Sequence, residues 1–237
     1  VGCSSGTASS VPVSASSAAE STVSSVEETA SSAVDENEAA DAQLLNDLTG
    51  SYQELWPVIL ADEYKQTWLD DCTALVGEDN AEAAFEKLSS MVTGDVYGED
   101  AVKAYANGGG AYFCGFTNSL AILTFDGETS TISGTDKDGN VLFSHTYHYI
   151  GMEPVRGLYE FQSDDADSGE FTYFFLAPDT SAETYHIEFR YGSDAEALSQ
   201  YDTGEYAYWL ASGISTDCDQ TMIDNCIELF CTENLAG

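Results

Sequence analysis

The feature that most constrains the fold is a series of short β-rich runs between residues 111 and 191. Each run is rich in β-branched and aromatic residues and is bounded by turn-forming residues, and Asp138 and Gly139 form a strong hairpin signal between two of the runs. Strands spaced so regularly are typical of an antiparallel barrel or sandwich rather than of a parallel sheet. We therefore predict a meander of about seven strands, over residues 111–116, 119–125, 129–134, 141–149, 157–161, 171–176 and 185–191.

Helical periodicity flanks these runs on both sides. Before them, apolar residues at helical spacing begin at Leu44, are interrupted by Gly50 and stop at Pro57, and a second helix is expected over residues 79–92. After Ser215 the apolar positions recover helical spacing. The sequence therefore predicts packing helices before the strands and one C-terminal helix after them.

The charge balance is strongly acidic. The 237 residues include 42 Asp and Glu against six Lys and Arg, a net charge of −36. Such a surface repels phosphate backbones and anionic lipid headgroups, which excludes nucleic acid as a partner. It attracts cations, although an acidic coat that only keeps an exported protein soluble is the alternative reading. The apolar runs are too short for a transmembrane helix, which needs roughly 20 residues.

The N-terminus resembles the processed end of a bacterial lipoprotein, with a small residue before Cys3. Acylation of Cys3 would anchor the protein to the outside of the bacterial cell membrane, whereas the alternative is an ordinary cysteine near the terminus. Residues 1–41 contain no aromatic or basic residue, and we read them as a disordered acidic tether. The folded domain is therefore expected over residues 42–237.

The remaining cysteines and serines suggest no catalytic chemistry. Five cysteines follow Cys3, at positions 72, 114, 218, 226 and 231, and an exported setting permits disulfides whose connectivity cannot be read from the spacing. The sequence contains no C-x-x-C pair, which would suggest a cysteine zinc site, and no G-x-S-x-G elbow, which would suggest a hydrolase. We expect a binding protein and not an enzyme.

The histidines are the sharper signal, because the chain has only three, His145, His148 and His186, all on expected strands. His186 and Glu188 fall on one face of a strand, since side chains alternate with a period of two. Zinc prefers three or more N, O or S ligands, and a barrel mouth could add His148 or His145 to this pair. The same pattern also fits the polar side of a half-exposed strand.

Several stretches together resemble the ZinT (YodA) family, a lipocalin-like zinc-binding domain that also forms the C-terminal half of some Gram-positive zinc-binding lipoproteins. The resemblance covers most of the chain from about Asp47 onward. It is carried by residues 50–57, by 137–139 followed by 147–151, by 155–161, by the Ala177–Pro178 pair and by 186–194. It implies a mainly β fold, a calycin-type antiparallel barrel with flanking helices on the N-terminal side and a C-terminal helix, in agreement with the periodicity.

The resemblance also implies a function and a set of ligands. The family's first zinc histidine corresponds to Phe174, which cannot coordinate a metal, and its His-x-His pair corresponds to His186 and Glu188, or with a one-residue gap to Thr184 and His186. We prefer the first alignment and expect His186, Glu188 and His148 to bind zinc or another divalent cation near the barrel mouth.

The expected function is thus extracellular zinc binding, with delivery of the metal to an importer. The alternative is a barrel without metal that acts as a surface interaction module, or that holds a small organic ligand among Tyr147, Tyr149, Phe174 and Tyr185.

Overall fold

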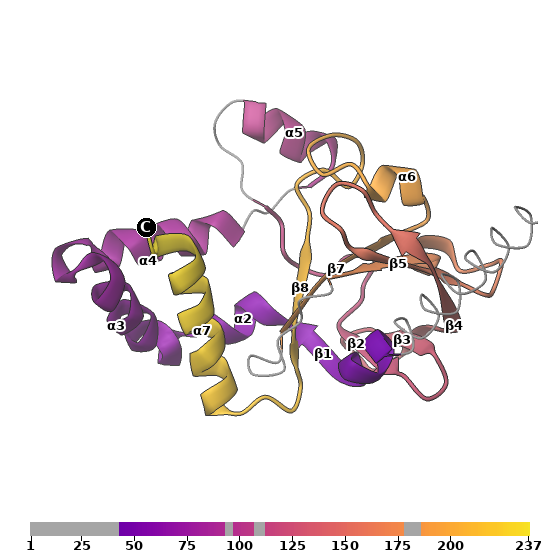
Figure 1. Cartoon of the computed structure of the whole chain (residues 1–237), viewed down its shortest axis with the longest axis horizontal. Coiled ribbons are helices and arrows are strands. Elements are labelled where there is room, and N and C mark those ends of the chain that lie inside the picture. Colours follow the sequence, from indigo (N-terminus) through magenta and orange to yellow (C-terminus); the bar gives the residue numbers. More distant parts are fainter. Residues whose placement is uncertain (1–42, 93–96, 107–111, 178–185) are drawn as a thin grey trace, which may run out of the picture. The chain divides into compact units, whose positions relative to one another are not determined.

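Eight antiparallel strands close into a barrel in which each strand pairs with its neighbours in sequence and β8 returns to β1 (Figure 1). The structure is a computed structural model that describes residues 43–92, 97–106, 112–177 and 186–237. Cys3 and the expected tether lie outside the described residues. The strands are β1 (Gly50–Glu54), β2 (Ile122–Asp126), β3 (Thr131–Thr135), β4 (Val141–Met152), β5 (Tyr159–Ser163), β6 (Tyr173–Leu176), β7 (His186–Gly192) and β8 (Ala211–Ser215).

The helices precede, interrupt and follow the barrel strands. They are α2 (Leu55–Ile59), α3 (Lys65–Val76), α4 (Glu78–Val92), α5 (Glu99–Ala106), α6 (Ala195–Leu198) and α7 (Gln220–Leu235), with a further turn of helix at 43–48 and short 3-10 turns at Asp62–Tyr64 and Gly169–Phe171. Asp219 is the N-cap of α7, and its carboxylate accepts a hydrogen bond from the Met222 amide at 3.0 Å. In the described part of the chain, none of the helices combines the length and apolar character that crossing a bilayer requires. The predicted lipocalin-like barrel with helices before it and a C-terminal helix is confirmed.

The barrel interior is a packed core. Eight strands leave a lumen only wide enough for side chains, and inward-facing residues fill it. Large aromatic side chains make up much of this core and are fully buried, among them Phe125, Phe161, Phe174, Phe189, Tyr191 and Trp209. The small-ligand alternative placed a molecule among Tyr147, Tyr149, Phe174 and Tyr185. Tyr147 and Phe174 instead belong to this core, and Tyr185 lies outside the described residues.

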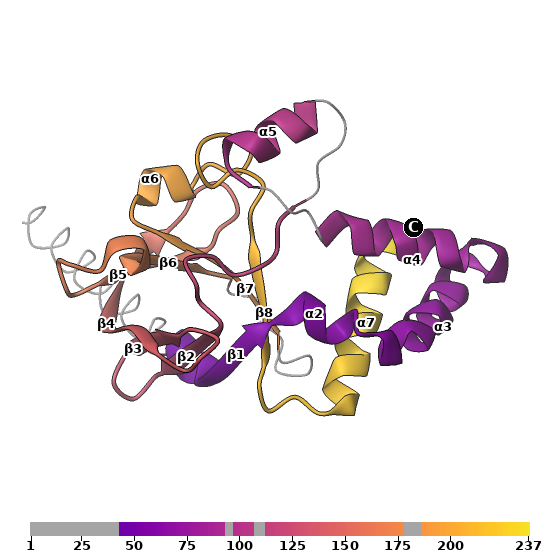
Figure 2. The same ribbon diagram turned by 180° about the vertical axis from the view of Figure 1, so that it is seen from behind.

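A second core lies where α2, α3, α4 and α7 pack together and against the outer face of the barrel. Leu55 and Ile59 of α2, Trp68 of α3 and Ile227 of α7 are buried in it, together with Ile214 of β8. Figures 1 and 2 show α3, α4 and α7 side by side in both views. The helices therefore cover one outer surface of the barrel, around β7 and β8.

The hairpin prediction is confirmed. Asp138 and Gly139 lie in the tight turn between β3 and β4, and Gly139 adopts a φ of +84°, which glycine accommodates without strain. The helix expected at 79–92 is also confirmed as α4, and the C-terminal helix as α7.

Three sequence-based expectations were wrong. Residues 50–54 follow a helical spacing but form β1, because pairing with β2 and β8 closes the barrel and outweighs the local pattern. Pro57 lies inside α2 and does not stop a helix there, since first-turn amides need no intrahelical partner. Of the strand expected at 111–116, the described residues form only an isolated bridge between Phe113 and Trp209. The strand β8 had not been anticipated.

Candidate functional site

His186 and Glu188 lie on the outer face of β7, toward the helices. Ile187, Phe189 and Tyr191 alternate with them and point into the barrel core. The His186 side chain is buried, and its ring centroid lies 5.7 Å from that of Phe230 in α7. The expectation that this pair faces the barrel mouth is therefore corrected. The physical reason is that the bulky apolar residues of β7 fill the lumen and leave its polar residues outside.

Two buried thiols accompany this face. Burial first, and then the Glu188 carboxylate, raises the pKa of the Cys114 thiol to about 12. Burial, followed by Cys218 and Glu188, raises the pKa of Cys226 to about 12 as well. Without a cation beside them, both thiols therefore stay protonated at neutral pH.

The histidines of β4 each contact a carboxylate of the loop that follows β5. Nδ1 of His148 lies 2.6 Å from Oδ1 of Asp164, and Nδ1 of His145 lies 2.6 Å from Oδ2 of Asp165. His148 is half-exposed, with 52% of its side chain accessible, whereas 17% of the His145 side chain is accessible. Both aspartates lie between the end of β5 and the 3-10 turn at Gly169–Phe171. The antiparallel pairing of β4 with β5 is what brings them beside the histidines.

The expected ligands His186, Glu188 and His148 are not brought together. β5 and β6 separate β4 from β7 around the barrel. Among all described residues, no three His, Cys, Asp or Glu side chains are arranged to hold one metal ion. Structural zinc sites use four protein ligands and catalytic ones three, so the described donors do not fit a closed zinc site.

Phe174, which the resemblance aligned with the first zinc histidine, lies inside the barrel. It is fully buried, and its ring centroid lies 5.3 Å from that of Tyr191 and 5.4 Å from that of Tyr147. A side chain at this position faces the core, on the opposite side of the barrel wall from His186.

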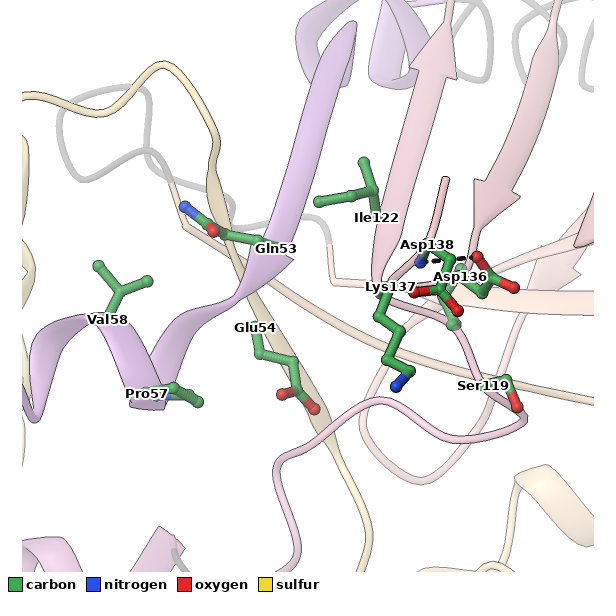
Figure 3. A pocket seen from close by; sticks show the side chains of 11 residues that line it. Gln53, Glu54, Pro57, Val58, Ser119, Ile122, Asp136, Lys137 and Asp138 are labelled. Atoms are coloured by element: carbon green, nitrogen blue, oxygen red, sulfur yellow. Dashed lines mark hydrogen bonds between the residues drawn. The ribbon is translucent and has the colours of Figure 1, made fainter. Parts of the chain in front are cut away.

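A groove of about 600 Å³ opens between the junction of β1 with α2 and the β3–β4 turn. Figure 3 shows Gln53, Glu54, Pro57 and Val58 on one side of it and Ser119, Ile122 and Lys137 on the other. Oε1 of Glu54 accepts a hydrogen bond from the Phe116 amide at 2.7 Å, which anchors that carboxylate. The sequence offered no signal for this groove, because its two walls are more than 60 residues apart.

The nearby Asp136 is occupied within its own turn. It accepts hydrogen bonds from the side chain and backbone of Asn140 and from the amide of Asp138, and these bonds lower the pKa of the Asp136 carboxyl. Lys137 and the carboxylate of Asp138 are therefore the ionic groups of this turn that remain available to a ligand in the groove.

Comparisons with known proteins give structural matches only. No known family and no curated protein matches the sequence. Among solved structures, the chain is similar to the Zn(II)-bound ZinT-like domain of Streptococcus pneumoniae AdcA, with 15% identity and a TM-score of 0.49 over 78% of this chain and 89% of that domain. It is also similar to Zn(II)-bound AdcA from the same organism, with 14% identity and a TM-score of 0.46 over 82% of this chain but only 35% of that one. The solved structures that this chain matches thus include a ZinT-like domain, the family that its sequence motifs resemble.

Proposed function

We propose that this protein binds divalent metal ions, zinc foremost, outside the bacterial cell, and that His148 on β4 is its principal donor. The observation that carries the proposal is the contact between Nδ1 of His148 and Oδ1 of Asp164 at 2.6 Å. In metal proteins, a ligating histidine usually donates its second ring nitrogen to a carboxylate, which orients the ring and makes it a better ligand. His148 has this arrangement, and its half-exposed ring leaves Nε2 as the donor for an incoming ion.

The net charge of −36 supports the proposal, because a negative surface raises the local concentration of cations. His145 with Asp165 forms a second, less accessible pair on the same strand. With one protein donor held in place and water filling the other positions, binding is expected to be weak and fast. Such binding suits capture of an ion and its transfer to an importer better than permanent storage.

The proposal includes the cellular setting. Acylation of Cys3 holds the protein at the outer face of the cell membrane through its lipid. The metal is cargo and is not used in catalysis. A metal importer is the partner that receives it.

Calorimetric titration of zinc into the full chain tests this proposal, with excess magnesium present to occupy isolated carboxylates. We expect His148→Ala to lose at least about tenfold in zinc affinity. His186→Ala, which removes the buried imidazole of β7, serves as the matched control and should bind zinc like the unaltered protein. If only His186→Ala lost zinc affinity, the site would have to lie at His186 on β7. If neither variant lost zinc affinity, zinc binding by these histidines would be rejected.

The groove favours a second candidate function, binding of a small organic molecule. Pro57, Val58 and Ile122 provide apolar wall, and Lys137 provides a positive charge beside the carboxylates of Glu54, Asp136 and Asp138. Apolar wall with a few placed polar groups is common for small-molecule sites. Native mass spectrometry of the purified protein should then show a bound organic molecule that Lys137→Ala loses. A bare protein mass would argue against it.

A further inference from the structure

The five described cysteines all lie in or against the helical core, and two of them are in contact. Cys72 of α3 and Cys231 of α7 are fully buried, and their Sγ atoms lie 3.9 Å apart. Among the described cysteines, the structure records a sulphur–sulphur contact for this pair alone. Nothing in the spacing of the cysteines had indicated this pairing.

We propose that Cys72 and Cys231 form a disulfide that fastens α3 to α7 when the protein folds in an oxidising compartment. A disulfide of usual geometry has its sulphur atoms about 2.05 Å apart, so side-chain rotation has to close about 2 Å. The two helices already pack against each other in the second core, which sets the backbone separation. The inference does not depend on metal binding.

The reaction is an exchange with a disulfide-containing oxidant, such as oxidised glutathione or a thiol–disulfide oxidoreductase. One cysteine thiolate attacks the oxidant to form a mixed disulfide and releases one thiol. The second cysteine then attacks the mixed disulfide, closes the Cys72–Cys231 bond and releases the second thiol. The two cysteines lose two electrons and two protons in total, and the two released thiols carry them.

Burial determines when this exchange takes place. Neither sulphur is accessible in the folded protein, and burial raises the pKa of both thiols, so little thiolate is present. Oxidation therefore occurs while the chain is still incompletely folded, and folding then protects the bond from reductants.

The bond would have a large effect on stability, because its ends are 159 residues apart in sequence. Cross-links that close long loops remove the most conformational freedom from the unfolded chain. We expect reduction of the oxidised protein to lower its melting temperature by roughly 10 °C.

Peptide mapping of the full chain tests the proposal without any substitution. The protein is refolded with oxidised and reduced glutathione, its free thiols are alkylated in denaturant, and it is digested after acidic residues, which are abundant. Cys72 is then released in the peptide 72–78, Cys231 in 229–233 and Cys226 separately in 225–228. The expected product is 72–78 linked to 229–233.

Two variants complete the test. Cys226→Ser should keep both the linked peptide and the drop in melting temperature on reduction, whereas Cys72→Ser should lose both. Recovery of peptides 72–78 and 229–233 in alkylated form, or linkage of either to another cysteine, would overturn the proposal.

Discussion

His148 and Asp164 form a hydrogen-bonded pair at 2.6 Å, although 16 residues separate them in sequence and they come from different sides of the β4–β5 hairpin. Both side chains are about half-exposed, so the imidazole is oriented by a carboxylate and still open to solvent. This pair is the one, among the described residues, to which the proposed function assigns capture of a metal ion.

Replacement of Asp164 should therefore weaken zinc binding. Asp164→Asn removes the negative charge that orients the His148 ring and makes it a better ligand, and we expect the zinc affinity to fall about tenfold. Asp167→Asn removes the same charge from the same loop without a recorded contact to histidine. Equal losses in the two variants, measured by calorimetry, would mean that only the general negative charge matters.

Replacement of Phe174 by histidine distinguishes the observed fold from the ligand set that the resemblance implied. Because Phe174 lies in the barrel core, Phe174→His should not raise the zinc affinity. It should lower the free energy of unfolding by about 3 kcal/mol, since an imidazole loses packing and hydrogen bonds there. Urea unfolding and zinc titration of the same sample measure both effects. A tenfold gain in zinc affinity would show that residue 174 faces the same site as His186.

Arg190 should be important for stability. It is fully buried, its guanidinium donates hydrogen bonds to the carbonyls of Leu198, Gln200 and Tyr206, and its Cζ lies 4.3 Å from the centroid of the Tyr201 ring. Arg190→Lys cannot span these carbonyls and should cost about 3 kcal/mol in denaturant unfolding.

The matched control for Arg190 is Arg156→Lys. Arg156 is exposed and donates to the Tyr112 hydroxyl at 2.8 Å, so its replacement should cost less than about 1 kcal/mol. Similar losses in both variants would contradict a special role for the buried guanidinium.

Asp71 should make stability depend on pH. Burial first, and then Glu228, Asp224 and Asp70, raises the pKa of its carboxyl. The folded protein therefore holds this proton more tightly than the unfolded chain, and the destabilising effect of Asp71 develops as the pH rises from its unfolded pKa of about 4 through its folded pKa.

Asp71→Asn should consequently stabilise the protein at pH 7, by less than about 1 kcal/mol because the site is partly exposed. The gain should disappear below about pH 4, where both states carry the proton. Thermal melts at the two pH values measure this difference. Asp79→Asn, at the start of α4, removes the same charge elsewhere, and an equal gain from it would assign the effect to total charge.

Much of the fold could be predicted because local patterns coincide with tertiary structure in the barrel. The turn at Asp138 and Gly139 and the strands around it follow from turn chemistry and alternation. The strand β1 could not be predicted in this way, because residues 50–54 acquire their conformation from β2 and β8, which are distant in sequence.

The candidate site was less predictable for the same reason. Alternation correctly placed His186 and Glu188 on one face of β7, but it could not say whether that face was inside or outside the barrel. Nor could it show that Asp164 and Asp165 would contact the two histidines of β4.

The sequence by itself determined the mainly β class, the helices at 79–92 and after Ser215, the strongly acidic charge and the small number of histidines, because these depend on composition and on short-range periodicity. Only the tertiary structure decided which side of each strand faces the core, and which of the scattered histidines, aspartates and cysteines become neighbours. Those relationships depend on the register in which eight strands close and on the surface that the helices cover, and contacts across the whole chain set both.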